Sequence, residues 1–511
     1  MKALKKSLCL ILSIVMMFSC FVLSSEAITI DGEEIDHLPQ VYVSGYESLS
    51  VHYKDDPNKT ALFPVNFDLL VENAKRVGDY TADSIKNMEP DLLYNYIYSL
   101  LYDSLGVYAL QPDGLTSVDE NVVCDELVFR HSGNGVYNFN YDCRLSPLDL
   151  AVQLHEFIKK VQEHSGSERF ELIGASYGTT VVMTYLNEHP EMHKNIDSLL
   201  LSVPSYGGFS VVGELFSGDF YIDHDTLTQY AYVGLNMEEL GLFLSVLNKS
   251  GVLEILLECL LIPGAKAIAL EAVLDVVRDA LGTIPSFWTF VQEEYFYDAI
   301  ENIYGENYAD PNHEYAPLIG KVTYYQEQVQ QRLDEIYRDA LDSGIKMNII
   351  CKYGRPPMPL SEKGSFMSDG AVAVSDVTMG AIASKYDETL PEGYKQALYP
   401  EYNFISPDNC IDASTGIDPL HTWYVKGLEH TLKNRGFNEL IDYILYEDPD
   451  VFSGDKFPQF TKAADDGSLV PVTGPDEKEE TTLLQDLLKL VIWLVKLIYG
   501  FVSDLIGKYS A

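Results

Sequence analysis

A serine between two glycines constrains this chain of 511 residues more than any other feature. The stretch "FELIGASYGTTVVMTYLNEHP", residues 170–190, begins as an apolar strand, turns at Gly-Ala-Ser-Tyr-Gly and continues as a helical pattern. Gly174 and Gly178 flank Ser176 at positions where a side chain would collide with a neighbouring strand or helix. The pattern predicts a sharp strand-turn-helix junction that raises the Ser176 hydroxyl on its bend.

Apolar runs bounded by turn residues predict strands before and after this junction. Helical patterns lie between several of them, and the clearest, residues 146–164, opens with Ser146 as N-cap and Pro147 in the first turn. Strands that alternate with helices indicate an α/β fold with a mostly parallel sheet. The predicted strands are 40–46, 135–141, 169–176, 196–205, 346–354 and 421–427.

This alternation stops between residues 210 and 345, where the sequence is largely helical in period and unusually apolar. We predict a helical cap at 210–345, inserted between a first core part at 28–209 and a second at 346–452. A buried helical lobe and a lid over an apolar acyl site both fit this pattern, and the lid is favoured.

Both ends of the chain fall outside this core. Residues 1–27 combine early lysines, an apolar run and a Ser-Glu-Ala cleavage site, which predicts a secretory signal peptide, with an uncleaved anchor as the alternative. Residues 453–480 have no apolar period and several Pro and Gly, which predicts a linker. A narrow polar stripe on the otherwise apolar segment 481–511 favours an amphipathic helix at a membrane surface, and packing on the protein itself is the alternative.

The formal net charge is −42, with 77 acidic and 35 basic residues. Because no basic stripe interrupts this acidity, we expect no nucleic-acid partner. The sequence contains no C-x-x-C or H-E-x-x-H pattern, so we expect no metal and no cofactor. A bridge between Cys124 and Cys143 is one reading of the cysteines, and buried free thiols are the favoured one.

The order of polar residues along the chain suits nucleophilic catalysis. A serine becomes nucleophilic when an imidazole takes its proton and a carboxylate fixes the imidazole. With a nucleophile on such a strand-turn-helix junction, these residues follow in the order Ser, acid, His. His430 comes just after the last predicted core strand in "TWYVKGLEH", whereas His421 precedes that strand. We therefore predict Ser176 as nucleophile and His430 as base.

Two segments could supply the acid. Asp369 in "SDGAVAVSDV" is closer to strand 346–354, whose far end should bear the acid. Asp408 in "SPDNCIDASTG" is closer to His430, and its Asp-x-x-Ile step should lead directly into the last strand. We prefer Asp408, keep Asp369 as the alternative acid and rank Asp412 third.

The reaction also needs two backbone N–H groups that face the developing oxyanion. Tyr177, directly after the nucleophile, should supply one of them. Tyr46, which follows Gly45 in the turn "VYVSGY", should supply the other.

Several segments together resemble the lecithin:cholesterol acyltransferase-like α/β-hydrolases. They are "VYVSGY", "NFNYDCRLSPLDLAVQLHEFI", the Ser176 junction, "IPSFWTF", the Asp-x-x-Ile loop and "WYVKGLEH". The "Y-D-x-R" piece is the most distinctive of them. The resemblance implies an α/β-hydrolase fold with a cap, and a serine acyl-enzyme mechanism on lipid esters that uses Ser176, His430 and Asp408.

The leading hypothesis is thus an exported serine esterase or lipase that hydrolyses acyl esters or passes the acyl group to an alcohol. A catalytically silent hydrolase fold that binds a surface or a lipid through its C-terminal helix is the alternative. A serine peptidase is a weaker reading, because the large apolar insertion suits acyl chains better than peptides.

Overall fold

The computed structural model describes residues 37–46, 49–59, 62, 90–129, 131–132, 135–219, 223–234, 238–252, 263–359, 366–447, 449–452, 456–475 and 482–490. The predicted signal peptide at 1–27 and most of the terminal segment 481–511 lie outside these ranges. Within them, no helix combines the length and apolar character that crossing a membrane requires.

In the described part of the chain, nine strands form one sheet in the order β13-β12-β11-β8-β7-β6-β1-β5-β4. The inner neighbours run parallel, and only the outermost strands β4 and β13 are antiparallel to their partners. The six predicted strands are all present. The sheet comprises β1 (Gln40–Val43), β4 (His131–Ser132), β5 (Val136–Phe139), β6 (Phe170–Ala175), β7 (Ile196–Ser202), β8 (Lys346–Tyr353), β11 (Thr422–Lys426), β12 (Phe460–Ala463) and β13 (Leu469–Pro471).

The central strands are buried along nearly their whole length. Every residue of β6 is buried, and so is every residue of β8 after Lys346. Parallel strands of this kind read as continuous apolar runs rather than alternating ones, because packed elements exclude water from them. This explains why "FELIGA" and "MNIICKY" lack the period of two that a half-exposed strand shows.

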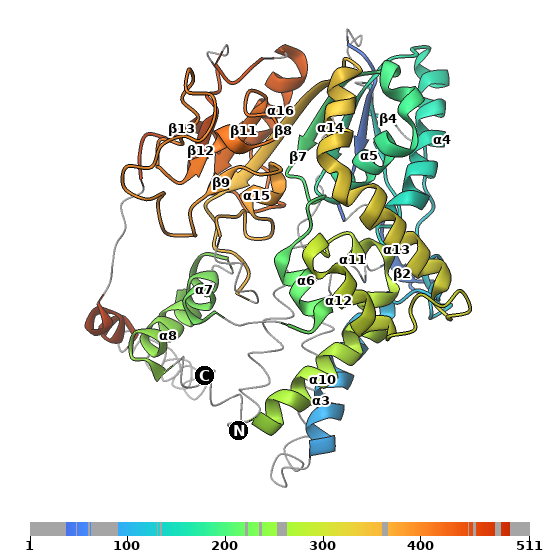
Figure 1. Cartoon of the computed structure of the whole chain (residues 1–511), viewed down its shortest axis with the longest axis vertical. Coiled ribbons are helices and arrows are strands. Elements are labelled where there is room, and N and C mark those ends of the chain that lie inside the picture. Colours follow the sequence, from blue (N-terminus) through green and yellow to red (C-terminus); the bar gives the residue numbers. More distant parts are fainter. Residues whose placement is uncertain are drawn as a thin grey trace, which may run out of the picture.

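Helices pack against this sheet (Figure 1). The first, α4 (Pro147–Ser165), begins at Ser146, whose hydroxyl accepts the Leu148 amide, and ends at Gly166, which has a φ of 70°. It contacts α5 (Tyr177–Glu188), which in turn contacts α14 (Leu333–Asp342). The predicted N-cap and first-turn proline of α4 are confirmed.

Between β7 and β8 the described residues form helices and no strand. Besides α14, these helices are α6 (Ser210–Ser217), α7 (His224–Gln229), η3 (Tyr230–Gly234), α8 (Glu238–Lys249), α10 (Pro263–Asp279), η4 (Leu281–Thr283), α11 (Pro285–Trp288), α12 (Glu293–Tyr304), α13 (Ala316–Gln328) and η5 (Gln330–Arg332). The helix α3 (Pro90–Leu105) packs along α10. The last helix, α14, contacts β8 and α5, so the end of the segment 210–345 packs with the sheet.

The segment 453–480 differs from its prediction as a linker, because it adds β12 and β13 to the sheet. The two strands are joined at Asp466 and Gly467, and Gly467 has the positive φ of 80° that this tight turn requires. The Phe460 ring stacks on Tyr424 of the neighbouring strand at 5.0 Å between centroids. These short strands were missed because their length leaves no detectable apolar period.

A further prediction concerns the cysteines. Cys124 and Cys143 are free thiols and do not form a bridge.

The described start of the terminal segment is helical over 483–490. There Asp486 is 1% exposed and its carboxylate accepts hydrogen bonds from Ser245 and Lys249 of α8, both at 2.7 Å.

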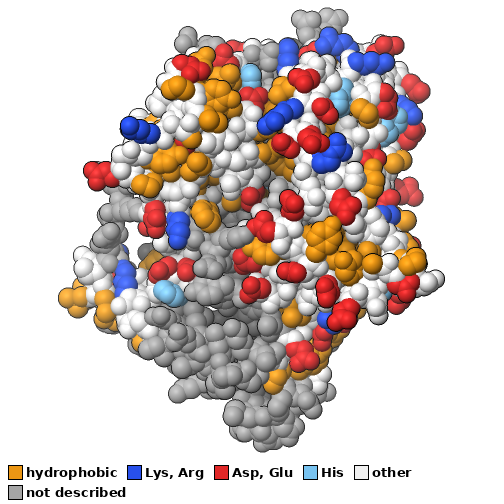
Figure 2. Space-filling view, viewed as in Figure 1, with side chains coloured by type: hydrophobic (Ala, Val, Ile, Leu, Met, Phe, Trp, Pro, Cys, Tyr) orange, Lys and Arg blue, Asp and Glu red, His pale blue; other side chains and the backbone are white. Residues whose placement is uncertain are grey.

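The surface carries the acidity that the composition indicates. Figure 2 shows Asp and Glu side chains spread over the viewed face, with Lys and Arg scattered among them.

Candidate active site

Ser176 occupies a strained turn between β6 and α5. Its φ is 50° and its ψ is −123°, a conformation that residues with a side chain rarely adopt. The flanking glycines are required by space: a Cβ on Gly178 would lie 2.2 Å from the Val43 carbonyl oxygen, and one on Gly174 would lie 3.0 Å from Thr179 Cα. The predicted junction is therefore present, with the serine at its apex.

The strand order places this turn at the centre of the sheet. From β6 the chain continues through β7, β8 and β11 on one side, whereas β1 and β5 lie on the other. In such sheets, ligands bind at the carboxyl ends of the strands, near the point where the order reverses. A mostly parallel sheet with flanking helices, and a serine on a strained turn between its central strand β6 and the helix α5, is the arrangement of the α/β-hydrolase fold. This chain has that fold.

A chain of hydrogen bonds joins Ser176, His430 and Asp369. Ser176 Oγ lies 2.7 Å from His430 Nε2, and His430 Nδ1 lies 2.7 Å from Asp369 Oδ2. The imidazole and the carboxylate are buried, with 3% and 0% of the residue exposed. The sequence separates these residues by up to 254 positions, and the fold brings them into direct contact.

The Asp369 carboxylate is held in its ionised form. Its second oxygen, Oδ1, accepts the backbone amides of Ala371 and Val372 at 3.0 and 2.9 Å. Burial alone raises the pKa of Asp369, but the neighbouring His430 and these amides outweigh burial and hold the pKa below its usual range. An ionised Asp369 accepts the Nδ1 proton of His430, which leaves Nε2 free to accept the Ser176 proton.

Asp408, the acid that we preferred from the sequence, is not brought to His430. Its Oδ2 accepts hydrogen bonds from Lys426 at 2.8 Å and Tyr353 at 3.1 Å, so it forms a buried ion pair. Asp412 is also placed elsewhere, where it accepts the Tyr394 hydroxyl.

The reason for this difference lies in the loop after β8. Two residues after β8, the Arg355 amide donates to the Ser368 carbonyl at 3.0 Å. This contact places the alternative acid, Asp369, at the end of β8 beside His430. The longer excursion that follows carries Asp408 to Lys426 instead.

The two residues predicted as oxyanion donors, Tyr46 and Tyr177, lie in the segments next to Ser176. Tyr177 is the first residue of α5, where the amides have no acceptor within their own helix. The turn that holds Gly45 and Tyr46 lies against Ser176, since a Cβ on Gly45 would be 3.2 Å from Ser176 Cβ. Glycine at position 45 is thus required by the close approach of the two segments.

Aromatic side chains form a wall behind these donors. The Tyr46 ring packs edge-on against Tyr177 at 5.3 Å and against Phe287 of α11 at 5.7 Å. The Tyr46 hydroxyl lies 2.8 Å from Ser286 Oγ. Burial is the main cause that raises the pKa of Tyr46 well above its usual value, so the phenol stays neutral. The segment "IPSFWTF" is therefore tied to the predicted oxyanion turn.

The "Y-D-x-R" piece forms an ion pair between Asp142 and Arg144 inside the protein. Arg144 is 3% exposed and binds both oxygens of the Asp142 carboxylate, through Nε at 2.9 Å and Nη2 at 2.7 Å. The Arg144 carbonyl accepts the Ser286 amide at 3.4 Å. This pair thus supports the segment that packs on Tyr46.

Two basic residues at the end of β8 hold the loop that carries His430, and the sequence analysis did not single them out. Lys352 is buried below the loop and donates to its backbone. Arg355 binds the Glu429 carboxylate and the Val233 carbonyl of η3. Both residues belong to "CKYGR", residues 351–355, and the position of this stretch at the end of a predicted core strand was the available signal.

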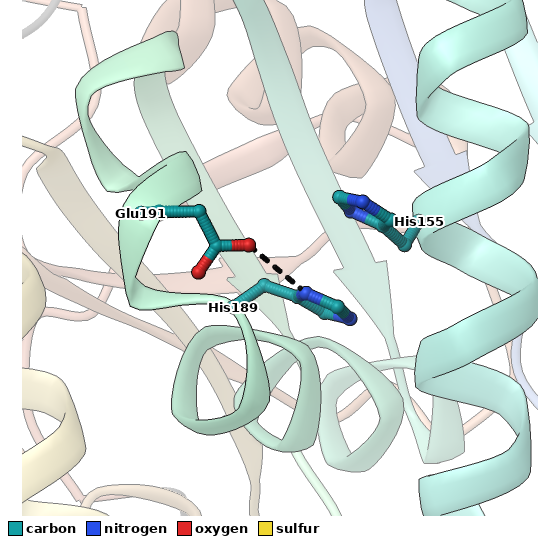
Figure 3. A group of neighbouring side chains, drawn as sticks. All are labelled: His155, His189 and Glu191. Atoms are coloured by element: carbon teal, nitrogen blue, oxygen red, sulfur yellow. Dashed lines mark hydrogen bonds and ion pairs between the residues drawn. The ribbon is translucent and has the colours of Figure 1, made fainter.

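A separate group of polar residues lies away from the triad, between α4 and the end of α5. His155, His189 and Glu191 place one ligand atom each within 4.8 Å of one another. The two imidazole rings are parallel, with centroids 4.1 Å apart and 4° between the planes, and within this group Glu191 bonds to His189 (Figure 3). Ring nitrogens bind metals in the plane of the ring, so stacked rings do not converge on one ion.

Comparisons with known proteins add little to this geometry. No family model matches the sequence, and no curated protein matches it. Among solved structures, it is similar to MGS-M2, an alpha/beta hydrolase enzyme from a Medee basin deep-sea metagenome library. That match has 12% identity and a TM-score of 0.16, and it covers 57% of this chain and 92% of the other. The fold assignment rests on the strand order and the Ser176 turn.

Proposed function

We propose that this protein is a serine hydrolase that cleaves or transfers the acyl groups of lipid esters through an acyl-enzyme. The hydrogen-bonded chain from Ser176 through His430 to Asp369, at the apex of a strained turn, carries the proposal. An ionised Asp369 facing Nδ1 favours the tautomer in which Nε2 accepts the Ser176 hydroxyl proton, which is the arrangement that this chemistry needs.

In the first half of the reaction, His430 Nε2 takes the Ser176 proton as Oγ attacks the ester carbonyl carbon. The carbonyl oxygen becomes an oxyanion, and the amides of Tyr46 and Tyr177 donate to it. The bond to the alcohol then breaks, and the alcohol leaves with the proton from His430. Water or a second alcohol repeats the attack on the acyl-enzyme and releases the acid or a new ester.

An acyl substrate is favoured by the surroundings of the site. The helices between β7 and β8 supply apolar side chains, and the wall behind the predicted oxyanion turn is aromatic. The segments that resemble the lecithin:cholesterol acyltransferase-like hydrolases point to the same class of substrate. Peptides would need more polar partners than this wall offers.

We further propose that the protein works outside the cytoplasm, because residues 1–27 have the pattern of a signal peptide. Contact with a membrane surface would use the terminal helix. Its described start exposes Leu484 and Leu488, with 76% and 60% of each residue accessible.

The decisive experiment treats the purified protein with a fluorophosphonate, which reacts only with an activated serine. We expect covalent labelling of the wild type and none of Ser176→Ala. A series of nitrophenyl esters of increasing chain length then tests the substrate class, with the highest kcat/KM expected for long acyl chains. A folded wild type that is not labelled would instead support a catalytically silent fold.

A further inference from the structure

Lys352 is a buried cation with an unusual set of partners. It lies on β8, pairs in register with Val425 of β11 and is 1% exposed. Its Nζ donates to three backbone carbonyl oxygens, those of Glu429, His430 and Leu432, at 3.0, 2.8 and 2.8 Å. An ammonium group has three N–H donors, so these three bonds use all of them.

The three carbonyls belong to one short loop. Residues 427–434 have neither helical nor strand structure, and they connect β11 to α16 (Arg435–Glu447). Such a loop depends on contacts with its surroundings for a fixed conformation, because its own backbone groups are not paired in a ladder. The amide of His430 donates to the Asp369 carbonyl at 3.1 Å, and its carbonyl accepts from Lys352. The backbone of His430 is therefore held on both sides of its Cα, through its amide and through its carbonyl.

From this geometry we infer that Lys352 is a positioning residue for His430. Its ammonium group fixes the loop 427–434 so that Nε2 of the imidazole faces Ser176. The inference rests on the proposed serine chemistry for its effect on rate, and on the contacts above for its effect on the loop. Lys352 itself touches neither Ser176 nor the imidazole through any of these bonds.

Only the protonated form of Lys352 has enough N–H donors for all three loop carbonyls. A neutral amine has two N–H donors for three carbonyls, so deprotonation leaves one buried acceptor without a partner. Burial is the main cause that lowers the pKa of Lys352, to about 7. The charges of Asp369 and Glu429 raise the pKa of Lys352, and that of Lys433 lowers it further. The ring of Phe437 on α16 lies 4.4 Å from Nζ. The positioning effect should therefore weaken as pH rises above neutrality.

The test compares wild type with Lys352→Met, which keeps the aliphatic length and removes the donors. Lys426→Met is the matched control, because Lys426 is a largely buried lysine on the adjacent strand that bonds to Asp408 instead of the loop. Hydrogen exchange of the amides at 427–434 and the rate of fluorophosphonate labelling, per folded protein, are both measured from pH 6 to 10.

In Lys352→Met we expect faster exchange confined to this loop, and labelling slower by about 10²-fold, the cost of a misplaced catalytic group. In wild type, labelling should fall on the alkaline side, and this fall should be absent from Lys352→Met. Lys426→Met should keep the loop protected and the alkaline fall intact. Unchanged loop exchange in Lys352→Met, or labelling within twofold of wild type, would overturn the inference.

A readout that needs no catalysis separates this inference from the proposed function. The proton on His430 Nδ1, bonded to Asp369, should give a far-downfield NMR resonance that His430→Ala lacks. If wild type is not labelled, the proposed function fails. The resonance then still shows whether Lys352 positions His430, because it reports the bond between His430 and Asp369 and not catalysis. Its loss in Lys352→Met but not in Lys426→Met would support positioning, and its persistence in Lys352→Met would refute it.

Discussion

His430 and Asp369 contact each other twice. Their side chains meet at 2.7 Å between Nδ1 and Oδ2, and the His430 amide donates to the Asp369 carbonyl at 3.1 Å. The backbone bond ties the loop after β11 to the loop after β8, so the orientation of the ring does not depend on side-chain rotamers alone. This double contact sets the tautomer that the Ser176 hydroxyl needs.

Asp369→Asn should abolish most of the activity. An amide at position 369 can donate to Nδ1 and thereby favour the wrong tautomer, so we expect a loss of about 10³- to 10⁴-fold in the labelling rate. Asp408→Asn keeps the triad intact and should stay within a few-fold of wild type. Labelling with fluorophosphonate measures both variants. If Asp408→Asn were the weaker of the two, Asp408 would be the acid after all.

The stability that Asp369 provides should depend on pH in one direction. Its folded-state pKa lies below the ordinary value of 3.8, so the folded protein binds this proton less readily than the unfolded chain. The contribution is therefore complete above the unfolded pKa of about 3.9 and is lost as pH falls through the folded pKa. Urea unfolding of wild type and Asp369→Asn should show a constant difference in free energy near neutrality that shrinks only in acid. A difference that already shrinks between pH 7 and 5 would contradict this assignment.

Gly178→Ala should destabilise the protein, because its Cβ would meet the Val43 carbonyl oxygen at 2.2 Å and neither backbone can move freely. We expect a loss of about 2–4 kcal/mol in the free energy of unfolding. Gly320→Ala is the control: it lies within α13, and its Cβ would meet nothing within 4 Å. It should stabilise by about 0.5–1 kcal/mol through helix propensity. Urea titration of both variants tests the prediction, and equal effects would refute the close approach.

Asp486→Ala should release the start of the terminal helix from α8. The buried carboxylate bonds to Ser245 and Lys249, and bonds of this charged kind each contribute about 1.5–3 kcal/mol. Limited proteolysis should then cut near residues 482–490 at least tenfold faster, by the same estimate. Leu484→Ala, at an exposed position of the same helix, should leave the rate unchanged. Equal cleavage of the two variants would show that Asp486 does not anchor the segment.

The sequence predicted the strained turn at Ser176 and the contact of His430 with it, but not which aspartate contacts His430. The residues that mark the Ser176 turn lie within five positions of one another, and His430 comes shortly after a recognisable strand. The choice between Asp369 and Asp408 depends on how the residues after β8 fold back, which is a tertiary contact between Arg355 and Ser368. Proximity to the end of β8 was the better guide than proximity to His430 in the sequence.

The contacts of the buried cations could not be predicted either. Lys352 and Lys426 lie in strands whose other residues are mostly apolar and buried. A charged side chain is not expected at such positions. Their partners, three loop carbonyls and Asp408, come from segments 18 to 80 residues away.

The β12–β13 hairpin, by contrast, could have been predicted from the sequence, since Asp-Gly between two short apolar runs is a recognised hairpin signal.

That hairpin determines how the sheet ends. Both borders of the sheet are short antiparallel strands, β4 and β13, and β13 closes with Pro471, which has no N–H to offer. A protein shortened to residue 452 would lose β12 and β13 and present the hydrogen-bonding groups of β11 to other molecules. Truncation at the apparent linker would thus produce a chain prone to edge-to-edge self-association, and any trimming for crystallisation should keep Val472, whose amide donates to the Phe460 carbonyl.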